Sequence, residues 1–286
     1  MEHKGTNVND TLIRASQRDA FLGQVGVRPL IMGILNITPD SFSDGGRFAS
    51  PQAAIAQTRK LTDEGADILD VGAESTRPGA IAVTEDEELA RIDALMPIVR
   101  AATHLPISID TYKARVAARG MALGACVIND VWGLQHDPAM AATVAQTGAG
   151  VVIMHNRSQV DGDLDILSDM RRFFDKSLAL AARENIPRHR IMLDPGIGFG
   201  KTQNQNLQAM QGLHHFDDYQ LPMLIGVSRK SLLGKLLDSA VDQRLIGTLS
   251  ANLACAARGA QIFRVHDVAE HRAAFRVFEA IQHGHG

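Results

Sequence analysis

Several polar residues in this sequence follow short apolar runs, and together they could bind a flat heterocycle that carries phosphate. One group combines carboxylates, a carboxamide and an amine: Asp110, Asn129, Asp194 and Lys230. Carboxylates accept from N–H groups and a carboxamide both donates and accepts, which suits a pterin or guanine edge. A second group offers amide, guanidinium and imidazole donors suited to phosphate or diphosphate: Asn36, Arg77, Arg264 and His266. We therefore expect one pocket for a heterocycle that carries a diphosphate.

These residues need a scaffold in which many strands end at one place. Past residue 29 the chain repeats a short apolar run, a polar or Gly-rich break and a segment with helical spacing. The eight runs are LIMGILN, DILDVG, PISID, ACVIND, VVIMH, RIMLDP, MLIGVS and QIFRVH. Eight such units in about 255 residues predict an α/β fold, a (β/α)8 TIM barrel whose active site lies at the C-terminal ends of the strands. A doubly wound open sheet is the alternative, but the Gly-x-Gly-x-x-Gly of its dinucleotide-binding members is missing after the first run.

The domain organisation predicted from this pattern is simple. No low-complexity linker divides the chain, so we expect a single domain, the barrel over residues 29–283, with a short N-terminal extension over residues 1–28.

Helix capping alone accounts for an isolated Asp or Asn after a strand. It does not account for Lys or Arg at a helix start, where the helix dipole disfavours cations. The strand-end residues are therefore interpreted as a pocket.

Composition excludes several other classes of function. The formal net charge is -3 and no basic face stands out, so we expect no nucleic-acid partner. No segment reaches the roughly 18 uninterrupted apolar residues of a membrane span, and the N-terminus lacks the apolar stretch of a signal peptide. Cys126 and Cys255 lie among apolar or small residues, which favours reduced, buried thiols. We expect a cytoplasmic protein.

Two other stretches suggest binding sites that we do not favour. GIGFGKT, residues 196–202, is similar to a phosphate-binding loop, but that motif needs Gly where Pro195 stands. The terminal HGHG could bind a metal, but a frayed tail is the simpler interpretation.

A family resemblance covers nearly the whole predicted barrel. Seven motifs carry the resemblance, in this order from about residue 31 to residue 268: MGILNITPDSFSDGG, DVGAESTRPGA, ISIDTYKARVA, INDVWG, LDPGIGFGKT, GVSRKSLLG and RVHDV. They resemble the motifs of the dihydropteroate synthases, which are transferases of folate biosynthesis. The resemblance implies a pterin-binding barrel that joins 6-hydroxymethyl-7,8-dihydropterin diphosphate to 4-aminobenzoate and releases pyrophosphate. It also implies that the diphosphate departs before the amine attacks.

The resemblance also implies roles for individual residues. The pterin-contacting positions match Asp110, Asn129, Met154, Asp194 and Lys230. The aminobenzoate end matches Phe199 and Ser228, and the diphosphate set matches Asn36, Arg264 and His266, with Asn36 also binding Mg2+. The segment after Met154, up to residue 170, departs from the family pattern because it lacks a Gly-Thr-Pro sequence.

Two loops complete the expected site. The stretch from Thr38 onward, with Phe42 and Asp44, matches the family's first mobile loop, and Thr76 and Arg77 match its second. We expect them to close over the substrates, with Phe42 covering the aminobenzoate. The residues that we expect to take part in catalysis are Asp44, Arg77, Asp194 and Lys230.

Other functions remain open at this point. A pterin-dependent methyltransferase domain uses a similar barrel but no diphosphate site, and a Schiff-base aldolase would use Lys230 as nucleophile. A paralogue that only binds pterin is a further alternative, although no key motif residue is missing. The resemblance further implies a homodimer and competition by sulfonamides, which mimic 4-aminobenzoate.

Overall fold

Eight parallel strands form the centre of the protein. The computed structural model describes residues 8–37, 50–74 and 83–284. The strands coincide with the eight apolar runs, except that β5 begins one residue before its run: β1 (Leu30–Asn36), β2 (Ile68–Gly72), β3 (Ile107–Asp110), β4 (Val127–Asp130), β5 (Gly150–Met154), β6 (Ile191–Asp194), β7 (Leu224–Ile225) and β8 (Ile262–Val265). The strand predictions are therefore confirmed, although β7 is much shorter than its run.

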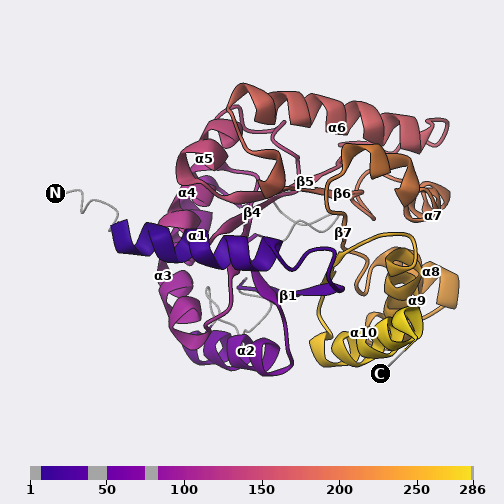
Figure 1. Cartoon of the computed structure of the whole chain (residues 1–286), viewed down its shortest axis with the longest axis horizontal. Helices are drawn as coiled ribbons and strands as arrows, with labels where there is room; N and C mark the ends of the chain where they lie inside the picture. Colours follow the sequence, from indigo (N-terminus) through magenta and orange to yellow (C-terminus); the bar gives the residue numbers. More distant parts are fainter. Residues whose placement is uncertain (1–7, 38–49, 75–82, 285–286) are drawn as a thin grey trace.

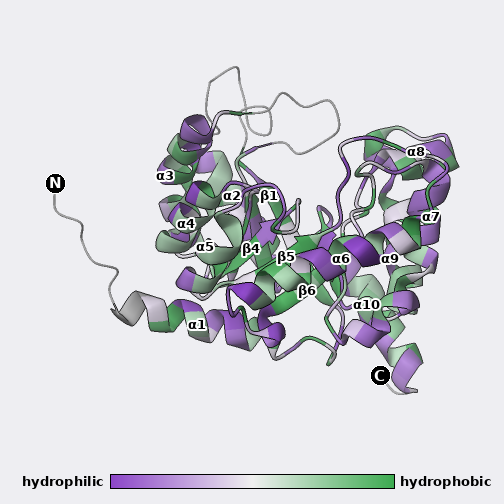
Figure 2. Ribbon diagram, turned by 90° about the horizontal axis from the view of Figure 1, so that it is seen from above, coloured by the Kyte–Doolittle hydropathy of each residue, from purple (hydrophilic) through white to green (hydrophobic). Residues whose placement is uncertain are grey.

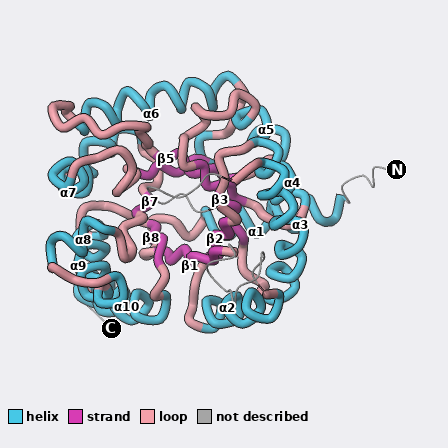
Figure 3. The backbone as a smooth tube through the Cα atoms, turned by 180° about the vertical axis from the view of Figure 1, so that it is seen from behind, coloured by secondary structure: helices cyan, strands magenta, loops and turns pink. Residues whose placement is uncertain are grey.

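The strands curl into a nearly closed barrel. Their order is β6-β5-β4-β3-β2-β1-β8-β7, and every neighbouring pair is parallel. Between the two outer strands, a bridge pairs Leu193 with Met223, and the Leu193 N–H donates to the Pro222 carbonyl at 2.8 Å. Figure 3 shows the strands as a ring inside the helices. The (β/α)8 prediction is confirmed.

Helices surround this ring (Figures 1 and 3). Those that follow strands are α2 (Pro51–Asp63), α3 (Glu85–Ala102), α4 (Ala114–Ala122), α5 (Met140–Thr147), α6 (Ile166–Arg183), α7 (Gln203–Gln211), α8 (Ser231–Leu237), α9 (Leu245–Ala256) and α10 (Val268–His283). Local sequence fixes where α2 begins, because the Ser50 side chain accepts from the Ala53 N–H at 3.1 Å and Pro51 occupies the first turn. None of the helices in the described ranges is long and apolar enough to cross a membrane.

One further helix, α1 (Val8–Leu22), precedes the barrel and lies across it in Figure 1. In the side view of Figure 2 it runs beneath the strands. Its Phe21 is buried and packs with Leu30 and Ile262, residues at the N-terminal ends of strands. The Arg18 guanidinium donates to the Gly148 carbonyl just before β5. The segment before β1 thus covers the N-terminal mouth of the barrel.

The two faces of the strands pack differently. Ile31, Leu69 and Phe263 face the helices and join the large outer core. Met32, Ile68 and Met192 point into the barrel and, with Phe21, fill its N-terminal end. Because side chains alternate along a strand, residues two positions further on also face inward, above this apolar layer. That is where the predicted site residues lie.

Candidate active site

The ends of four neighbouring strands bring predicted residues to one level. The strand register pairs Asn36 with Gly72, Gly72 with Asp110, and Asp110 with Asn129. The small Gly72 leaves space there, since a Cβ at this position would lie 3.5 Å from Asp110 Oδ2 and 3.6 Å from Asn36 Oδ1. The three polar side chains therefore line one side of the barrel mouth.

Arg264 bridges the interior of the barrel. Its Nε donates to Asp70 Oδ2 at 2.5 Å, and its Nη2 donates to Asp110 Oδ2 at 2.6 Å. The Asn129 amide also donates to Asp70 Oδ2, at 3.1 Å. The two carboxylates raise the pKa of the Arg264 guanidinium against the opposing effect of burial, so this side chain is a permanent cation. Four side chains from β2, β3, β4 and β8 thus form one network.

Asp70 was not among the residues predicted from sequence. Its side chain is fully buried on β2, in the middle of the run DILDVG. The available signal was its charge, because an acid inside an apolar strand is costly unless it is paired. Its partners come from β4 and β8, which are distant in sequence, so the pairing could not be foreseen.

The network leaves buried acceptor atoms without partners. Among the described residues, Asp110 Oδ1 and Asn129 Oδ1 are buried and accept no hydrogen bond. Buried polar atoms are nearly always satisfied, by protein, water or a ligand. Two neighbouring unsatisfied acceptors at a barrel mouth suit N–H groups of a bound heterocycle.

The opposite side of the mouth carries Asp194 and Lys230. Asp194 Oδ1 accepts from the Gly196 N–H at 2.7 Å, and the Lys230 ammonium donates to the Ile197 carbonyl. Lys230 begins α8 without capping it, as expected for a residue that serves a pocket. A Cβ at Gly226 would lie 3.9 Å from both Asp194 Oδ2 and Lys230 Nζ, so this glycine keeps the space between them open.

Burial shifts the pKa values of this pocket. Burial raises the pKa of Asp110 to about 7, with Arg264 opposing the shift and Asp70 adding to it. Burial also raises the pKa of Asp194, against the nearby Lys230 charge. The pKa of Lys230 falls to about 8 because burial outweighs the attraction of Asp194. Three groups that titrate abnormally in one cleft are typical of a catalytic site.

Met154 and Phe199 supply the apolar surfaces. Met154 is buried at the end of β5 and is the register partner of Asp194. The Phe199 ring lies beneath the Lys230 ammonium, 4.6 Å from its centre. The structure thus brings Met154, Phe199, Asp194 and Lys230 to one side of the mouth.

The glycine-rich segment between β6 and α7 is no phosphate loop. Lys201 is buried, and its ammonium donates to the carbonyls of Gly196 at 2.8 Å and Phe199 at 3.1 Å. Gly196 has a φ of 64°, and a Cβ there would lie 1.8 Å from the His155 carbonyl oxygen. The glycines therefore serve close backbone packing, in line with the sequence interpretation.

Comparisons with known proteins agree with this geometry. Residues 32–266 match the family of pterin binding enzymes. A dihydropteroate synthase from Bacillus subtilis is 43% identical over 241 residues, which is 84% of each chain. The chain belongs to the dihydropteroate synthase family.

Solved members of the dihydropteroate synthase family share the whole barrel. The Clostridium difficile enzyme, studied in the presence of pteroic acid, is 44% identical with a TM-score of 0.87, covering 90% of this chain and 98% of its own. The Xanthomonas albilineans enzyme with 4-aminobenzoic acid is 41% identical with a TM-score of 0.85, covering 89% and 93%.

Ser228 and His266 lie together in this member of the family. Ser228 Oγ is 3.0 Å from His266 Nδ1 and accepts from the His266 backbone N–H at 3.2 Å. The family resemblance implies the aminobenzoate end for Ser228 and the diphosphate end for His266, and the structure places these two residues in contact at the loops after β7 and β8. Next to them, Arg229 forms an ion pair with Asp267, which is a structural role.

Four predicted residues belong to segments outside the part of the chain that the structure describes: Phe42, Asp44, Thr76 and Arg77. Within the described ranges, no group of three His, Cys, Asp or Glu side chains could hold a metal ion. Asn36 stands at the mouth with one neutral oxygen, a donor that suits Mg2+ when substrate phosphate supplies further oxygens.

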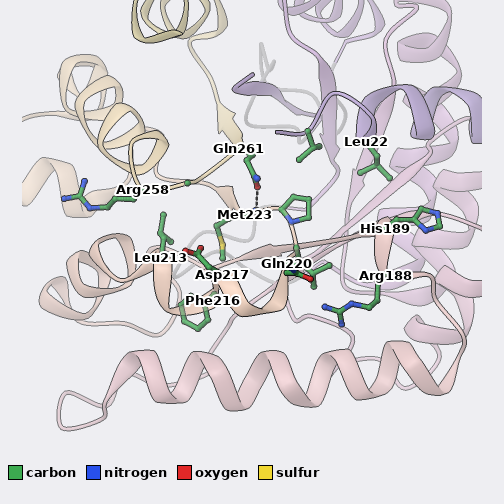
Figure 4. Close-up of a pocket in the computed structure, with 14 residues that line it drawn as sticks. Leu22, Arg188, His189, Leu213, Phe216, Asp217, Gln220, Met223, Arg258 and Gln261 are labelled. Carbon is green, nitrogen blue, oxygen red and sulfur yellow. Dashed lines mark hydrogen bonds between the residues drawn. The ribbon is translucent and has the colours of Figure 1, made fainter. Parts of the chain in front are cut away.

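A cavity of about 680 Å3 lies far from these groups (Figure 4). Its wall includes His189 just before β6, Met223 just before β7 and Gln261 just before β8, so it opens at the N-terminal end of the barrel. Gln261 accepts from the Met223 N–H at 3.0 Å. The chemistry of a barrel belongs at the other end.

Proposed function

We propose that this chain condenses 6-hydroxymethyl-7,8-dihydropterin diphosphate with 4-aminobenzoate to give 7,8-dihydropteroate and pyrophosphate. One observation carries the assignment to this pocket: unsatisfied acceptors on Asp110 and Asn129 face the same mouth as Asp194 and Lys230. Family membership supports it, as do related structures determined with 4-aminobenzoic acid and in the presence of pteroic acid.

The pterin is bound at its N–H edge. Asp110 Oδ1 and Asn129 Oδ1 accept from the heterocycle, and Asp194 accepts from its amino and ring N–H groups. Met154 packs against the ring face. Lys230, held by the Ile197 carbonyl, places a positive charge beside Asp194 and donates to the polar edge of the pterin.

The reaction breaks the bond between the exocyclic methylene and the diphosphate oxygen. The electron-rich dihydropterin ring stabilises the cation that remains, and Asp194 stabilises the positive charge that spreads onto the ring. The neutral arylamine then attacks the methylene, forms the new C–N bond and loses one proton. No Ser, Cys or Lys nucleophile is required.

The departing diphosphate needs positive charge around it. Arg264 and His266 lie near the mouth on β8 and its loop, and we assign them to this role. Because Nε and Nη2 of Arg264 pair with Asp70 and Asp110, Arg264 would meet the diphosphate through its remaining N–H groups. Asn36 would hold Mg2+ jointly with the diphosphate oxygens, and the ion when bound neutralises the leaving group. Arg77 and Asp44, together with Thr76, are assigned to the same end by family resemblance alone.

The aminobenzoate lies over the Phe199 ring, with its carboxylate toward Ser228 at the start of α8. Phe42 is assigned to its cover by resemblance. A sulfonamide that mimics aminobenzoate is expected to compete for this place.

We assign a homodimeric assembly to the protein. Supporting this, α8, α9 and the turn between them expose apolar side chains: Leu236, Leu237, Val241 and Ile246. Large apolar side chains exposed on neighbouring elements favour association. We also assign it to the cytoplasm, where free thiols such as the unbonded Cys126 and Cys255 are usual.

Calorimetry with pyrophosphate tests the diphosphate end. Saturable binding that requires Mg2+ is expected. Pterin binding without any pyrophosphate binding would instead favour a methyl-transfer domain.

A further inference from the structure

Asp70 has no role in the reaction described above, yet it holds two residues that do. The carboxylate lies on β2, fully buried, one layer above the apolar floor of the barrel. A single oxygen, Oδ2, accepts from Arg264 Nε at 2.5 Å and from Asn129 Nδ2 at 3.1 Å. The other oxygen is buried without a partner among the described residues.

The charge of Asp70 decides which way the Asn129 amide faces. An ionised carboxylate can only accept hydrogen bonds, so it must meet the NH2 end of the amide. Asn129 Oδ1 is therefore the atom left for a ligand, and it is buried and unsatisfied. With a donor at position 70 instead, the amide could turn and present NH2 to the ligand.

The same carboxylate sets the fork of Arg264. Its Nε faces Asp70 and its Nη2 faces Asp110, so the planar guanidinium is fixed across the barrel. This contact also occupies Asp110 Oδ2 and leaves Asp110 Oδ1 as the free acceptor. One buried acid thus determines two acceptor atoms of the pocket.

We propose that Asp70 is a positioning residue: by holding the Asn129 amide and the Arg264 guanidinium, it presents the Asn129 and Asp110 acceptors to the pterin. The proposal rests on the proposed function of this pocket. Asp70 acts through its two partners and touches no substrate.

A pH profile provides a readout that a merely structural role would not move. Arg264 from β8 contacts Asp110, and the charges of Asp70 from β2, Glu88 from α3 and Asp130 from β4 act on it from further away. Lys230, at the start of α8, also interacts with the Asp110 charge. The negative charge of Asp70 contributes to raising the pKa of Asp110 to about 7. Asp70→Asn removes the Asp70 charge and therefore lowers the pKa of Asp110. The loss of pterin affinity on the acidic side of the pH profile, called the acidic limb here, then moves to lower pH.

The experiment measures binding of 6-hydroxymethylpterin by calorimetry for five proteins across pH. They are the wild type, Asp70→Asn, Asn129→Asp, the exchange variant Asp70→Asn/Asn129→Asp, and the control Asp67→Asn. Asp67 lies three residues before Asp70 and also pairs with two arginines, Arg28 and Arg272, but at the other end of the barrel. The control therefore makes the same chemical change away from the pocket.

Asp70→Asn is expected to weaken binding about tenfold, the order of one charge-assisted hydrogen bond, and to shift the acidic limb downward. In the exchange variant, the carboxylate at position 129 again presents an acceptor to the ligand, and residues 70 and 129 together again carry one negative charge. This variant should therefore regain part of the affinity for the pterin. Asp67→Asn should lower only the melting temperature.

Unchanged affinity and an unmoved pH profile in Asp70→Asn would overturn the proposal, as would equal shifts in Asp67→Asn. If Asp70→Asn does not fold, the test is the comparison of the exchange variant with Asn129→Asp. If the exchange variant binds the pterin no more tightly than Asn129→Asp does, the proposal is contradicted. A wild type that binds no pterin would instead contradict the proposed function, so the two failures are distinguishable.

Discussion

The Lys230 ammonium lies 4.6 Å from the centre of the Phe199 ring and donates to the carbonyl of Ile197, two residues before Phe199. This contact joins Lys230, which we assign to the pterin, to Phe199, which we assign to the aminobenzoate. Lys201 donates to two further carbonyls of the same loop, those of Gly196 and Phe199. Two lysines therefore hold the loop between β6 and α7 on which the proposed aminobenzoate site depends.

Removing either charged partner of the pterin pocket should abolish turnover without unfolding the protein. Lys230→Ala and Asp194→Asn are expected to lower kcat/KM by at least about a hundredfold, because each removes a preorganised charge. Steady-state kinetics measures the loss, and circular dichroism checks the fold. Lys235→Ala, an exposed lysine one turn along α8, is the matched control and should retain activity. Near-normal turnover in Lys230→Ala would contradict the pocket assignment.

The pH dependence of kcat/KM should be bell-shaped and narrow. Asp110 accepts from the pterin when ionised, so activity rises as the pH passes about 7. Lys230 acts as a cation, so activity falls as the pH passes about 8. Asp110→Asn should remove the acidic limb of the residual activity. A flat wild-type profile across about pH 6–9 would mean that these groups do not control the reaction.

Gly196→Ala should be far more destabilising than an ordinary left-handed glycine substitution. Both Gly196 and Gly259 have positive φ, 64° and 92°, but nothing lies within 4 Å of a Cβ at Gly259. Gly259→Ala should lower the free energy of unfolding by about 1 kcal/mol through backbone strain alone. Gly196→Ala adds the clash with the His155 carbonyl and should cost at least about 3 kcal/mol. Urea unfolding measures both, and equal values would show that the loop can move away.

A charge on the apolar surface of α9 should split the proposed dimer. Ile246→Glu is expected to shift the mass measured by light scattering from dimer to monomer, because a buried carboxylate has no partner there. Val277→Glu, an exposed apolar residue of α10, is the control and should leave the mass unchanged. A wild type that is already monomeric would contradict the assembly.

Sequence predicted the elements and the strand-end residues well because both depend on local pattern. Apolar runs located all eight strands, and the position of Asp110, Asn129 and Asp194 at the C-terminal ends of those runs predicted that they meet at one mouth of the barrel. The pairing of Asp70 could not be predicted because its partners, Asn129 and Arg264, lie on strands distant in sequence. The contacts of Lys201 with the Gly196 and Phe199 carbonyls are local, but they depend on the folded path of the glycine-rich loop, which residue types alone do not determine. The contact between Ser228 and His266 likewise depends on β7 lying next to β8, which only the closed barrel determines.

Pyrophosphate release, measured in a coupled assay with the wild-type protein and Mg2+, decides whether the protein has the proposed activity. We expect stoichiometric release of pyrophosphate with formation of 7,8-dihydropteroate only when both 6-hydroxymethyl-7,8-dihydropterin diphosphate and 4-aminobenzoate are present. No dihydropteroate with both substrates present would contradict it.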